Sequence, residues 1–118
     1  MRLIVVGSRQ FDSEKHQVLI FDYLDRLHSN KTITEVVCGV ARGPDSIGEE
    51  WATSRGVKVA YFPAAWDTYK NAAGPIRNKQ MGDYAECLVA FWDGKSRGTK
   101  HMMDVMIKQQ KPYYLVTL

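Results

Sequence analysis

Glycine and basic residues share one short stretch, Gly-Lys-Ser-Arg-Gly at residues 94–98, between an apolar run and a helical pattern. Gly94 and Gly98 favour a backbone with positive φ that can approach a bound group, and Thr99 is suited to cap the following helix. Amides at a helix start attract anions. Three cations accompany them, namely Lys95, Arg97 and Lys100. We predict a phosphate site here, although one such loop alone would also suit a polar connection.

Three further loops of this kind, at residues 7–11, 39–45 and 63–74, follow apolar runs and strengthen the prediction. Strands are predicted at residues 3–6, 33–38, 57–62, 87–91 and 112 or 113 to 116, and helices at 13–28, 44–55, 75–84 and 99–109. Strands that alternate with crossover helices favour parallel pairing. The chain is therefore predicted to be one α/β domain, residues 1–118, with a three-layer Rossmann-like sandwich and a mostly parallel five-stranded sheet.

Such sheets bind ligands outside the carboxyl ends of their strands, near the point where the strand order reverses. With the predicted order 3-2-1-4-5, that point lies between the first and fourth strands. The four loops would then share one edge of the sheet. We expect a ligand pocket at this edge.

The composition describes a folded domain with a modest positive charge. Of 118 residues, 45% are hydrophobic, and the net charge of +3 is too small to argue for nucleic acid by itself. Cys38 and Cys87 lie in apolar runs and are expected to be buried and reduced. The histidines share no metal-ligand spacing with them. We expect no metal, no cofactor, no membrane span and a cytoplasmic location.

Several short motifs occur in order along the chain. They are Gly-Ser-Arg at 7–9, Gly-Val-Ala-Arg-Gly-Pro-Asp at 39–45, Glu-Trp-Ala at 50–52, Phe-Pro-Ala-Ala-Trp at 62–66, Ala-Gly-Pro-Ile-Arg-Asn at 73–78, and Met81. Together they resemble the YAcAr-type family of the SLOG superfamily, common in phage and bacterial genomes. The resemblance implies a Rossmann-like fold that binds nucleotides or nucleotide-derived ligands. The superfamily also includes LOG-type phosphoribohydrolases and the Smf/DprA proteins.

The LOG-type signature is similar to the second half of this chain. It has an arginine and a methionine on a helix, then a strand, then a glycine-rich loop and helix, as Arg77, Met81 and residues 87–99 do here. Met102 stands where the LOG-type enzymes carry their catalytic glutamate. A thioether cannot stabilise an oxocarbenium-like charge or position water as a carboxylate can. The resemblance therefore implies binding without the LOG reaction.

Alternatives stay open for several of these residues. Arg77 could clamp a phosphate or pair with Asp83 or Glu86 on the surface. Ser8 could offer a hydroxyl to the ligand or form a turn, and Asp45 could bind a ribose hydroxyl or favour a helix start. Trp66 and Trp92 could stack on a base or pack against another subunit. The expected ligand-binding residues are Gly7, Ser8, Arg9, Gly39, Arg42, Gly43, Asp45, Trp66, Arg77, Asn78, Asp93, Gly94, Lys95, Ser96, Arg97, Gly98 and Thr99, and no catalytic residue is expected.

The leading functional hypothesis is a protein that senses or sequesters a phosphorylated nucleotide derivative, such as an ADP-ribose-like or cyclic nucleotide signal. A phage-encoded version could sequester a host immune nucleotide. The alternatives are a nucleotide N-glycosidase that uses another acid, such as Glu50, Asp45 or Asp93, and a DNA-binding module of Smf/DprA type. Of these hypotheses, DNA binding is the least favoured, because the net charge is low. We also expect a homo-oligomer.

Overall fold

The computed structural model describes residues 1–8, 14–39 and 44–117, with the side chains of residues 44 and 45 excluded. Its strands are β1 (Arg2–Gly7), β2 (Glu35–Cys38), β3 (Lys58–Tyr61), β4 (Cys87–Trp92) and β5 (Tyr113–Thr117). Its helices are α1 (Glu14–Asn30), α2 (Pro44–Ser54), α3 (Trp66–Tyr69), α4 (Ala73–Tyr84) and α5 (Arg97–Lys108), and a 3-10 turn spans Lys70–Ala72. The predicted succession of strands and crossover helices is confirmed.

The five strands form one parallel sheet in the order β3-β2-β1-β4-β5, which confirms the predicted order. β1 lies at the centre, where Leu3 pairs with Val36 of β2 and with Cys87 of β4. A central strand covered on both faces requires an unbroken apolar run, and Leu3 to Val6 supply it. The strand order reverses between β1 and β4, so their carboxyl ends define the edge at which a ligand is expected.

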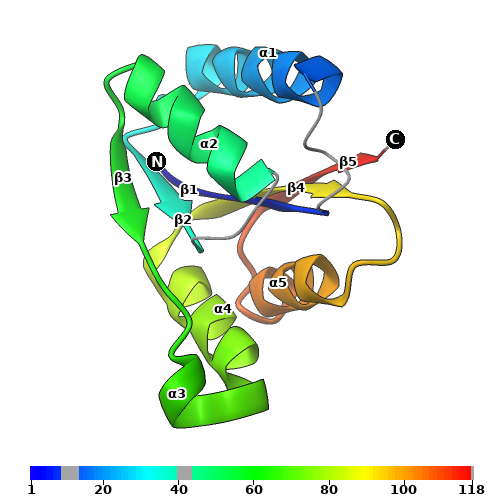
Figure 1. Cartoon of the computed structure of the whole chain (residues 1–118). Helices are drawn as coiled ribbons and strands as arrows, with labels where there is room; N and C mark the ends of the chain where they lie inside the picture. Colours follow the sequence, from blue (N-terminus) through cyan, green and yellow to red (C-terminus); the bar gives the residue numbers. More distant parts are fainter. Residues whose placement is uncertain (9–13, 40–43, 118) are drawn as a thin grey trace.

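Helices cover both faces of the sheet, with α1 and α2 on one face and α4 and α5 on the other (Figure 1). Alternate residues of β1 point to opposite faces: Leu3 and Val5 join the core under α1 and α2, whereas Ile4 and Val6 join the core under α4 and α5. Met102, Met103 and Met106 of α5 fill the second core. Among the described residues, no helix combines the length and apolarity required to cross a membrane.

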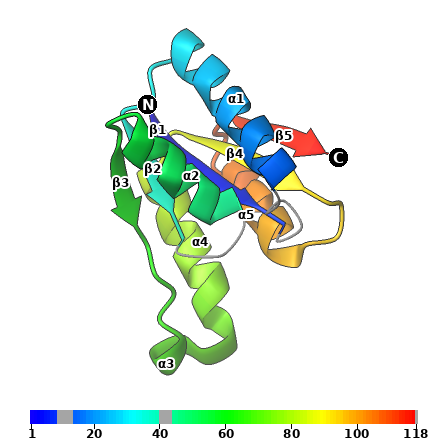
Figure 2. The same cartoon turned by 45° about the horizontal axis from the view of Figure 1, so that its top comes forward.

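The segment between β3 and α4 differs from its prediction as a polar connection with a helix starting at Pro75. Trp66–Tyr69 form the short helix α3, which projects beyond the sheet in two views (Figures 1 and 2). After the 3-10 turn, α4 already begins at Ala73, whose side chain is buried. Pro75 is then the third residue of α4, where a missing backbone N–H is tolerated because the first turn has no internal acceptor. A four-residue helix has no periodic signal, so the sequence pattern missed it.

The second strand starts at Glu35 and not at the predicted Ile33. The Ile33 amide donates to Nδ1 of His28 at 2.9 Å, so it is unavailable to a neighbouring strand. The Ile33 side chain is nevertheless buried in the core, as its apolar character predicts. Both cysteines are buried, as expected.

An acid-sensitive contact joins α1 to α2. Asp25 Oδ1 accepts from Arg55 Nε at 2.9 Å and from Trp51 Nε1 at 2.8 Å, and Oδ2 accepts from Arg55 Nη2 at 2.9 Å. The hydrogen bonds from Arg55 and Trp51 lower the pKa of Asp25 from 3.8 to about 2. Because the folded-state pKa lies below the unfolded one, the contribution to stability is complete above 3.8 and is lost as the pH falls toward about 2.

Asp25→Asn should therefore lower the urea midpoint at neutral pH, and the gap to the original chain should close as the pH falls through this window. The effect is small because the pair is partly exposed. Urea titrations of both proteins across the acid range provide the check. A gap that stays constant with pH would show that the ion pair does not contribute as described.

Candidate functional site

The carboxyl ends of β1 and β4 lie side by side and are joined through Ser8. Gly7 pairs with Phe91, and the Ser8 amide donates to the Phe91 carbonyl oxygen at 2.8 Å. The Ser8 hydroxyl, only 2% of the residue being exposed, accepts from the Asp93 amide at 3.0 Å. In this structure Ser8 therefore holds the loop after β4 against the end of β1.

Asp93 organises the loop that the sequence identified as a phosphate cradle. Its Oδ1 accepts from the amides of Lys95 at 2.8 Å and Ser96 at 2.9 Å. These hydrogen bonds lower the pKa of Asp93, so the carboxylate stays ionised. Lys95 and Ser96 were both expected to bind the ligand, but in the structure an internal carboxylate already accepts from their amides.

The helix start also differs from the prediction. α5 begins at Arg97, and its N-cap is Ser96, whose hydroxyl accepts from the Thr99 amide at 3.5 Å, so Thr99 is not the cap. Gly94 has the predicted positive φ, at 85°, whereas Gly98 lies inside the helix and is not among the positive-φ glycines. In the described part of the chain, the amides of Arg97 and Gly98 have no protein acceptor, as is usual in a first helical turn.

Ser96→Ala should destabilise the protein by about 1 kcal/mol, because it removes the oxygen that caps α5. Ser96→Thr keeps a hydroxyl at the same place and is the matched control. Chemical denaturation of the three proteins measures the difference. Equal losses in both variants would assign the effect to altered packing and not to the cap.

Arg77 of α4 reaches the end of β2. Its Nη1 donates to the Gly39 carbonyl oxygen at 2.6 Å, and its Nε donates to Oδ1 of Asn78 at 3.1 Å. The alternative surface pairing of Arg77 does not occur: Asp83 pairs with Lys79, and Glu86 pairs with Arg2. The guanidinium is therefore held at the carboxyl edge of the sheet, as a ligand-binding role requires.

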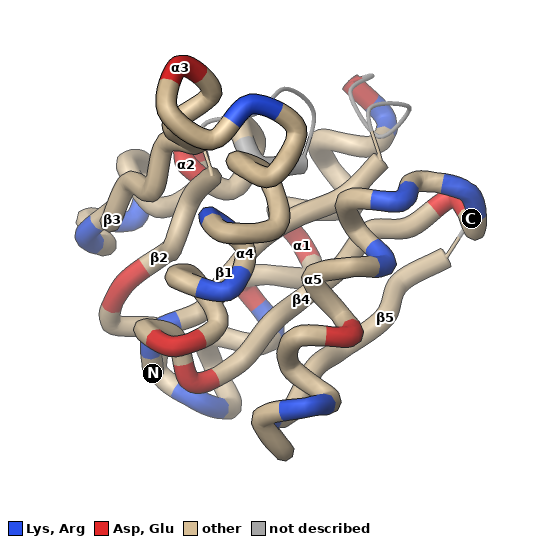
Figure 3. The backbone as a smooth tube through the Cα atoms, turned by 90° about the horizontal axis from the view of Figure 1, so that it is seen from below, with Lys and Arg blue, Asp and Glu red and all other residues tan. Residues whose placement is uncertain are grey.

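Asn78 ties this arginine to α5. The side chain is buried, with 6% exposed, and its Nδ2 lies 3.0 Å from Nδ1 of His101 and 3.5 Å from the Gly98 carbonyl oxygen. Arg77 and the start of α5 thus belong to one cluster with the ends of β1, β2 and β4. Figure 3 shows basic residues on the segment that leads into α5, beside the end of β5.

Other predicted residues are placed differently or lie outside the description. Trp66 is 58% exposed on α3, and Thr99 is buried, with its hydroxyl bonded to Ser96. Trp92 ends β4, and its indole Nε1 donates to the Ser96 carbonyl oxygen at 3.0 Å. Lys95, Arg97 and Gly98 are exposed. Arg9, Arg42, Gly43 and the side chain of Asp45 lie outside the described residues.

Of the three alternative acids, Asp93 lies in the loop after β4, and the side chain of Asp45 lies outside the described residues. Glu50, one alternative acid, accepts from Gln17 Nε2 and so lies on the outer surface between α1 and α2. Met102, at the position of the LOG-type glutamate, is 0% exposed within the core. No cluster of His, Cys, Asp or Glu that could hold a metal occurs among residues 1–8, 14–39 and 44–117.

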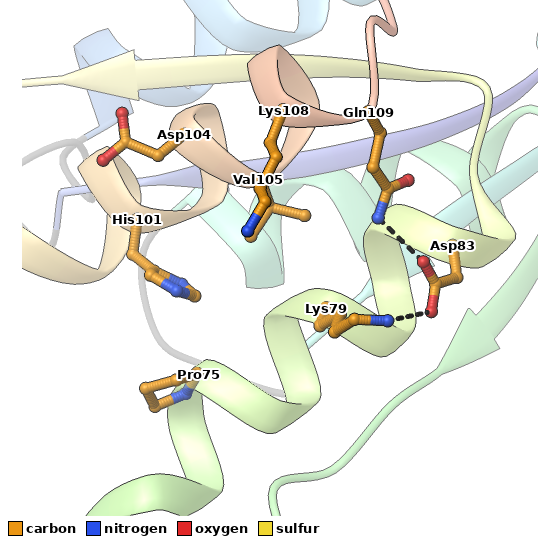
Figure 4. Close-up of a pocket in the computed structure, with 8 residues that line it drawn as sticks. All are labelled: Pro75, Lys79, Asp83, His101, Asp104, Val105, Lys108 and Gln109. Atoms are coloured by element: carbon orange, nitrogen blue, oxygen red, sulfur yellow. Dashed lines mark hydrogen bonds and ion pairs between the residues drawn. The ribbon is translucent and has the colours of Figure 1, made fainter.

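A groove of about 550 Å³ between α4 and α5 adds a residue that the sequence did not single out for the site. It is lined by Pro75, Lys79, Asp83, His101, Asp104, Val105, Lys108 and Gln109 (Figure 4). His101 belongs both to this groove and to the Asn78 cluster. No motif or spacing marks His101, because its role depends on how the two helices pack.

Known proteins resemble the chain in sequence and in fold. Gene 61 protein of Mycobacterium phage D29 is 35% identical over 109 residues, which cover 86% of this chain and 85% of that protein. DprA, DNA processing protein A, from Streptococcus pneumoniae has a similar fold, with a TM-score of 0.77 over 97% of this chain at 16% identity. The chain spans about half, 49%, of that DprA chain, and the likeness concerns the fold alone.

The family match covers three of the five strands. The family model described as "YAcAr: YspA, cpYpsA-related SLOG family" matches residues 1–69, from β1 through α3. The phage relative extends the similarity to most of the chain. The chain therefore belongs to the YAcAr family of SLOG proteins.

Proposed function

We propose that this protein binds a phosphorylated, nucleotide-derived small molecule at the carboxyl edge of β1 and β4. SLOG family membership suggests nucleotide-related binding in general. The observation that carries the specific proposal is the fixed Arg77 guanidinium, held by Gly39 and Asn78 at the edge where Rossmann-like sheets bind ligands. An arginine held in this way can bind phosphate oxygens with little further loss of side-chain freedom.

The charges and donors near Arg77 support an anionic ligand. Among the described residues, the remaining N–H groups of Arg77 and the amides of Arg97 and Gly98 have no protein acceptor. Lys95 and Arg97 add positive charge at the exposed surface. Because Asp93 already holds the amides of Lys95 and Ser96, the phosphate is expected near Arg77 and the first turn of α5.

Sequestration or sensing fits this site better than hydrolysis. Met102 is buried where a LOG-type enzyme has its glutamate, and the Asp93 carboxylate is occupied in holding its own loop. The similarity to a phage protein supports a role in an infected bacterial cell, with an ADP-ribose-like or cyclic nucleotide signal as the sequestered ligand. We further propose that the protein acts in the cytoplasm as a homo-oligomer.

A panel of nucleotides tests this function. The protein is incubated with nucleoside monophosphates, NAD, ADP-ribose and cyclic dinucleotides, its melting temperature is measured, and each mixture is then chromatographed. We expect one class of ligand to stabilise the fold, by about 2.7 kcal/mol at a hundred times its dissociation constant, and to be recovered intact. Released base or ribose phosphate would identify an N-glycosidase instead. No stabilisation by any phosphorylated nucleotide would contradict the proposal.

A further inference from the structure

A series of polar contacts crosses from α5 to the end of β2 and includes Arg77. The series runs from His101 through Asn78 to Arg77 and ends at the Gly39 carbonyl oxygen. Its links measure 3.0, 3.1 and 2.6 Å in that order. Asn78 lies in the middle and is buried, so its amide must be satisfied by these neighbours.

Two neighbours determine which way the Asn78 amide points. Arg77 has only N–H donors, so the atom facing its Nε must be the oxygen Oδ1. The Gly98 carbonyl oxygen only accepts, so the atom facing it must be Nδ2. The reversed amide would place two donors together at Arg77 and two acceptors together at Gly98. Both contacts therefore select the same orientation.

This orientation in turn determines the state of the His101 ring. Nδ2 of Asn78 is a donor, and it lies 3.0 Å from Nδ1 of His101, which must therefore accept. A neutral imidazole that accepts at Nδ1 carries its proton on Nε2. A ring with a proton on Nδ1 would place two N–H donors face to face and leave a partly buried N–H without an acceptor.

We propose that His101 and Asn78 are positioning residues for the anion-binding arginine. His101, in its Nε2-protonated form, orients the Asn78 amide, and that amide holds the Arg77 guanidinium against Gly39. Three guanidinium N–H groups are then left without an acceptor among the described residues, and they are available to a phosphate. This last step rests on the proposed function, whereas the arrangement of His101, Asn78 and Arg77 does not.

His101 also lines the groove between α4 and α5. Figure 4 shows the ring projecting from α5 toward α4 within this groove. A change at the ring is therefore passed to Arg77 through one intervening side chain. His101 thus links the packing of α4 against α5 to the position of the Arg77 guanidinium at the end of β2.

Nuclear magnetic resonance tests the arrangement without any ligand. In the unmodified protein, long-range ¹H–¹⁵N spectra should show a protonated Nε2 and an unprotonated Nδ1 for His101. The Arg77 Nε–H signal, assigned by its loss in Arg77→Lys, should be sharp and protected from exchange. His101→Leu should broaden or shift it strongly, and His101→Asn should restore it, because Asn can place an oxygen near the position of Nδ1.

Lys108→Leu is the matched control, since Lys108 lies on the same helix and lines the same groove but is outside this chain of contacts. It should leave the Arg77 signal unchanged. A proton on Nδ1 in the unmodified protein, or an Arg77 signal indifferent to His101→Leu, would overturn the positioning role. If Lys108→Leu perturbed the signal as much as His101→Leu, general repacking of α5 would explain the effect, and the proposal would be wrong.

Titration with ADP-ribose and with inorganic pyrophosphate as probes then tests the consequence for binding. His101→Leu should raise the dissociation constant about tenfold, the loss expected for one hydrogen-bonded link, and His101→Asn should stay within about twofold of the original. Unchanged affinity in His101→Leu would refute the link to the ligand. If neither probe bound the original protein, the proposed function would fail for these ligands, and the resonance data would still decide the positioning role.

Discussion

Arg77→Ala is expected to remove most of the thermal stabilisation that a phosphorylated nucleotide gives to this protein. Arg77 donates to Gly39 and Asn78 through two of its five N–H groups, so the other three can bind phosphate oxygens. A charge-assisted hydrogen bond contributes about 1.5 to 3 kcal/mol, which corresponds to a loss of roughly ten- to a hundredfold in affinity. Isothermal titration with the stabilising nucleotide measures this loss directly.

Lys79→Ala is the appropriate control for that substitution. Lys79 is two residues further along α4, is largely exposed, and pairs with Asp83 on the groove side. Lys79→Ala removes the same formal charge from the same helix as Arg77→Ala does. It should weaken binding only slightly, through long-range electrostatics. Equal losses in the two variants would mean that the ligand responds to overall charge and that Arg77 does not contact it.

Gly48→Ala is expected to destabilise the fold by about 1 to 3 kcal/mol, the usual cost of inserting a methyl group into a packed core. Gly48 lies on α2, where an added Cβ would meet Cβ and Cγ1 of Val5 at 2.9 Å. Val5 belongs to the central strand and is 1% exposed, so it has no space into which to move. α2 would have to shift away from β1, the strand whose end carries Ser8. Urea denaturation gives the change in the free energy of unfolding.

Gly74→Ala provides the comparison for Gly48. Gly74 also lies in a helix, but an added Cβ would meet only the Trp66 ring, at an ordinary contact distance of 3.6 Å. This variant should be neutral or slightly more stable, because alanine favours helix over glycine. If both variants lost stability equally, the close packing of α2 on β1 would not be the cause.

The fold was predictable because its signals are local. Apolar runs such as Leu3–Val6 mark strands buried on both faces, and the strand-helix alternation leads to a parallel sheet with right-handed crossovers. The predicted order is therefore confirmed throughout the described chain. The exceptions are short or depend on side-chain capping. α3 has too few residues for a period, and α5 starts two residues early because Ser96 supplies the cap.

The candidate site was predictable only in outline. Its edge follows from the strand order, and Arg77 was identified through the resemblance to LOG-type proteins. Its contact with Gly39, however, joins residues 38 positions apart and depends on how α4 packs on the sheet. At Asp93 the unpredicted contact is short in sequence. Its carboxylate accepts from the amides of Lys95 and Ser96, two residues that the pattern of glycines and cations assigned to a ligand. Residue types alone cannot distinguish an internal carboxylate from an external phosphate.

A chemical-shift map of the protein bound to the nucleotide that stabilises it most would test the central claim most directly. The proposed site predicts that the perturbed backbone amides cluster at Ser8, Gly39, Arg97 and Gly98, together with the Arg77 Nε–H group. Perturbations confined to the outer faces of α1 and α2, or the absence of any change at these five positions under saturating ligand, would contradict it.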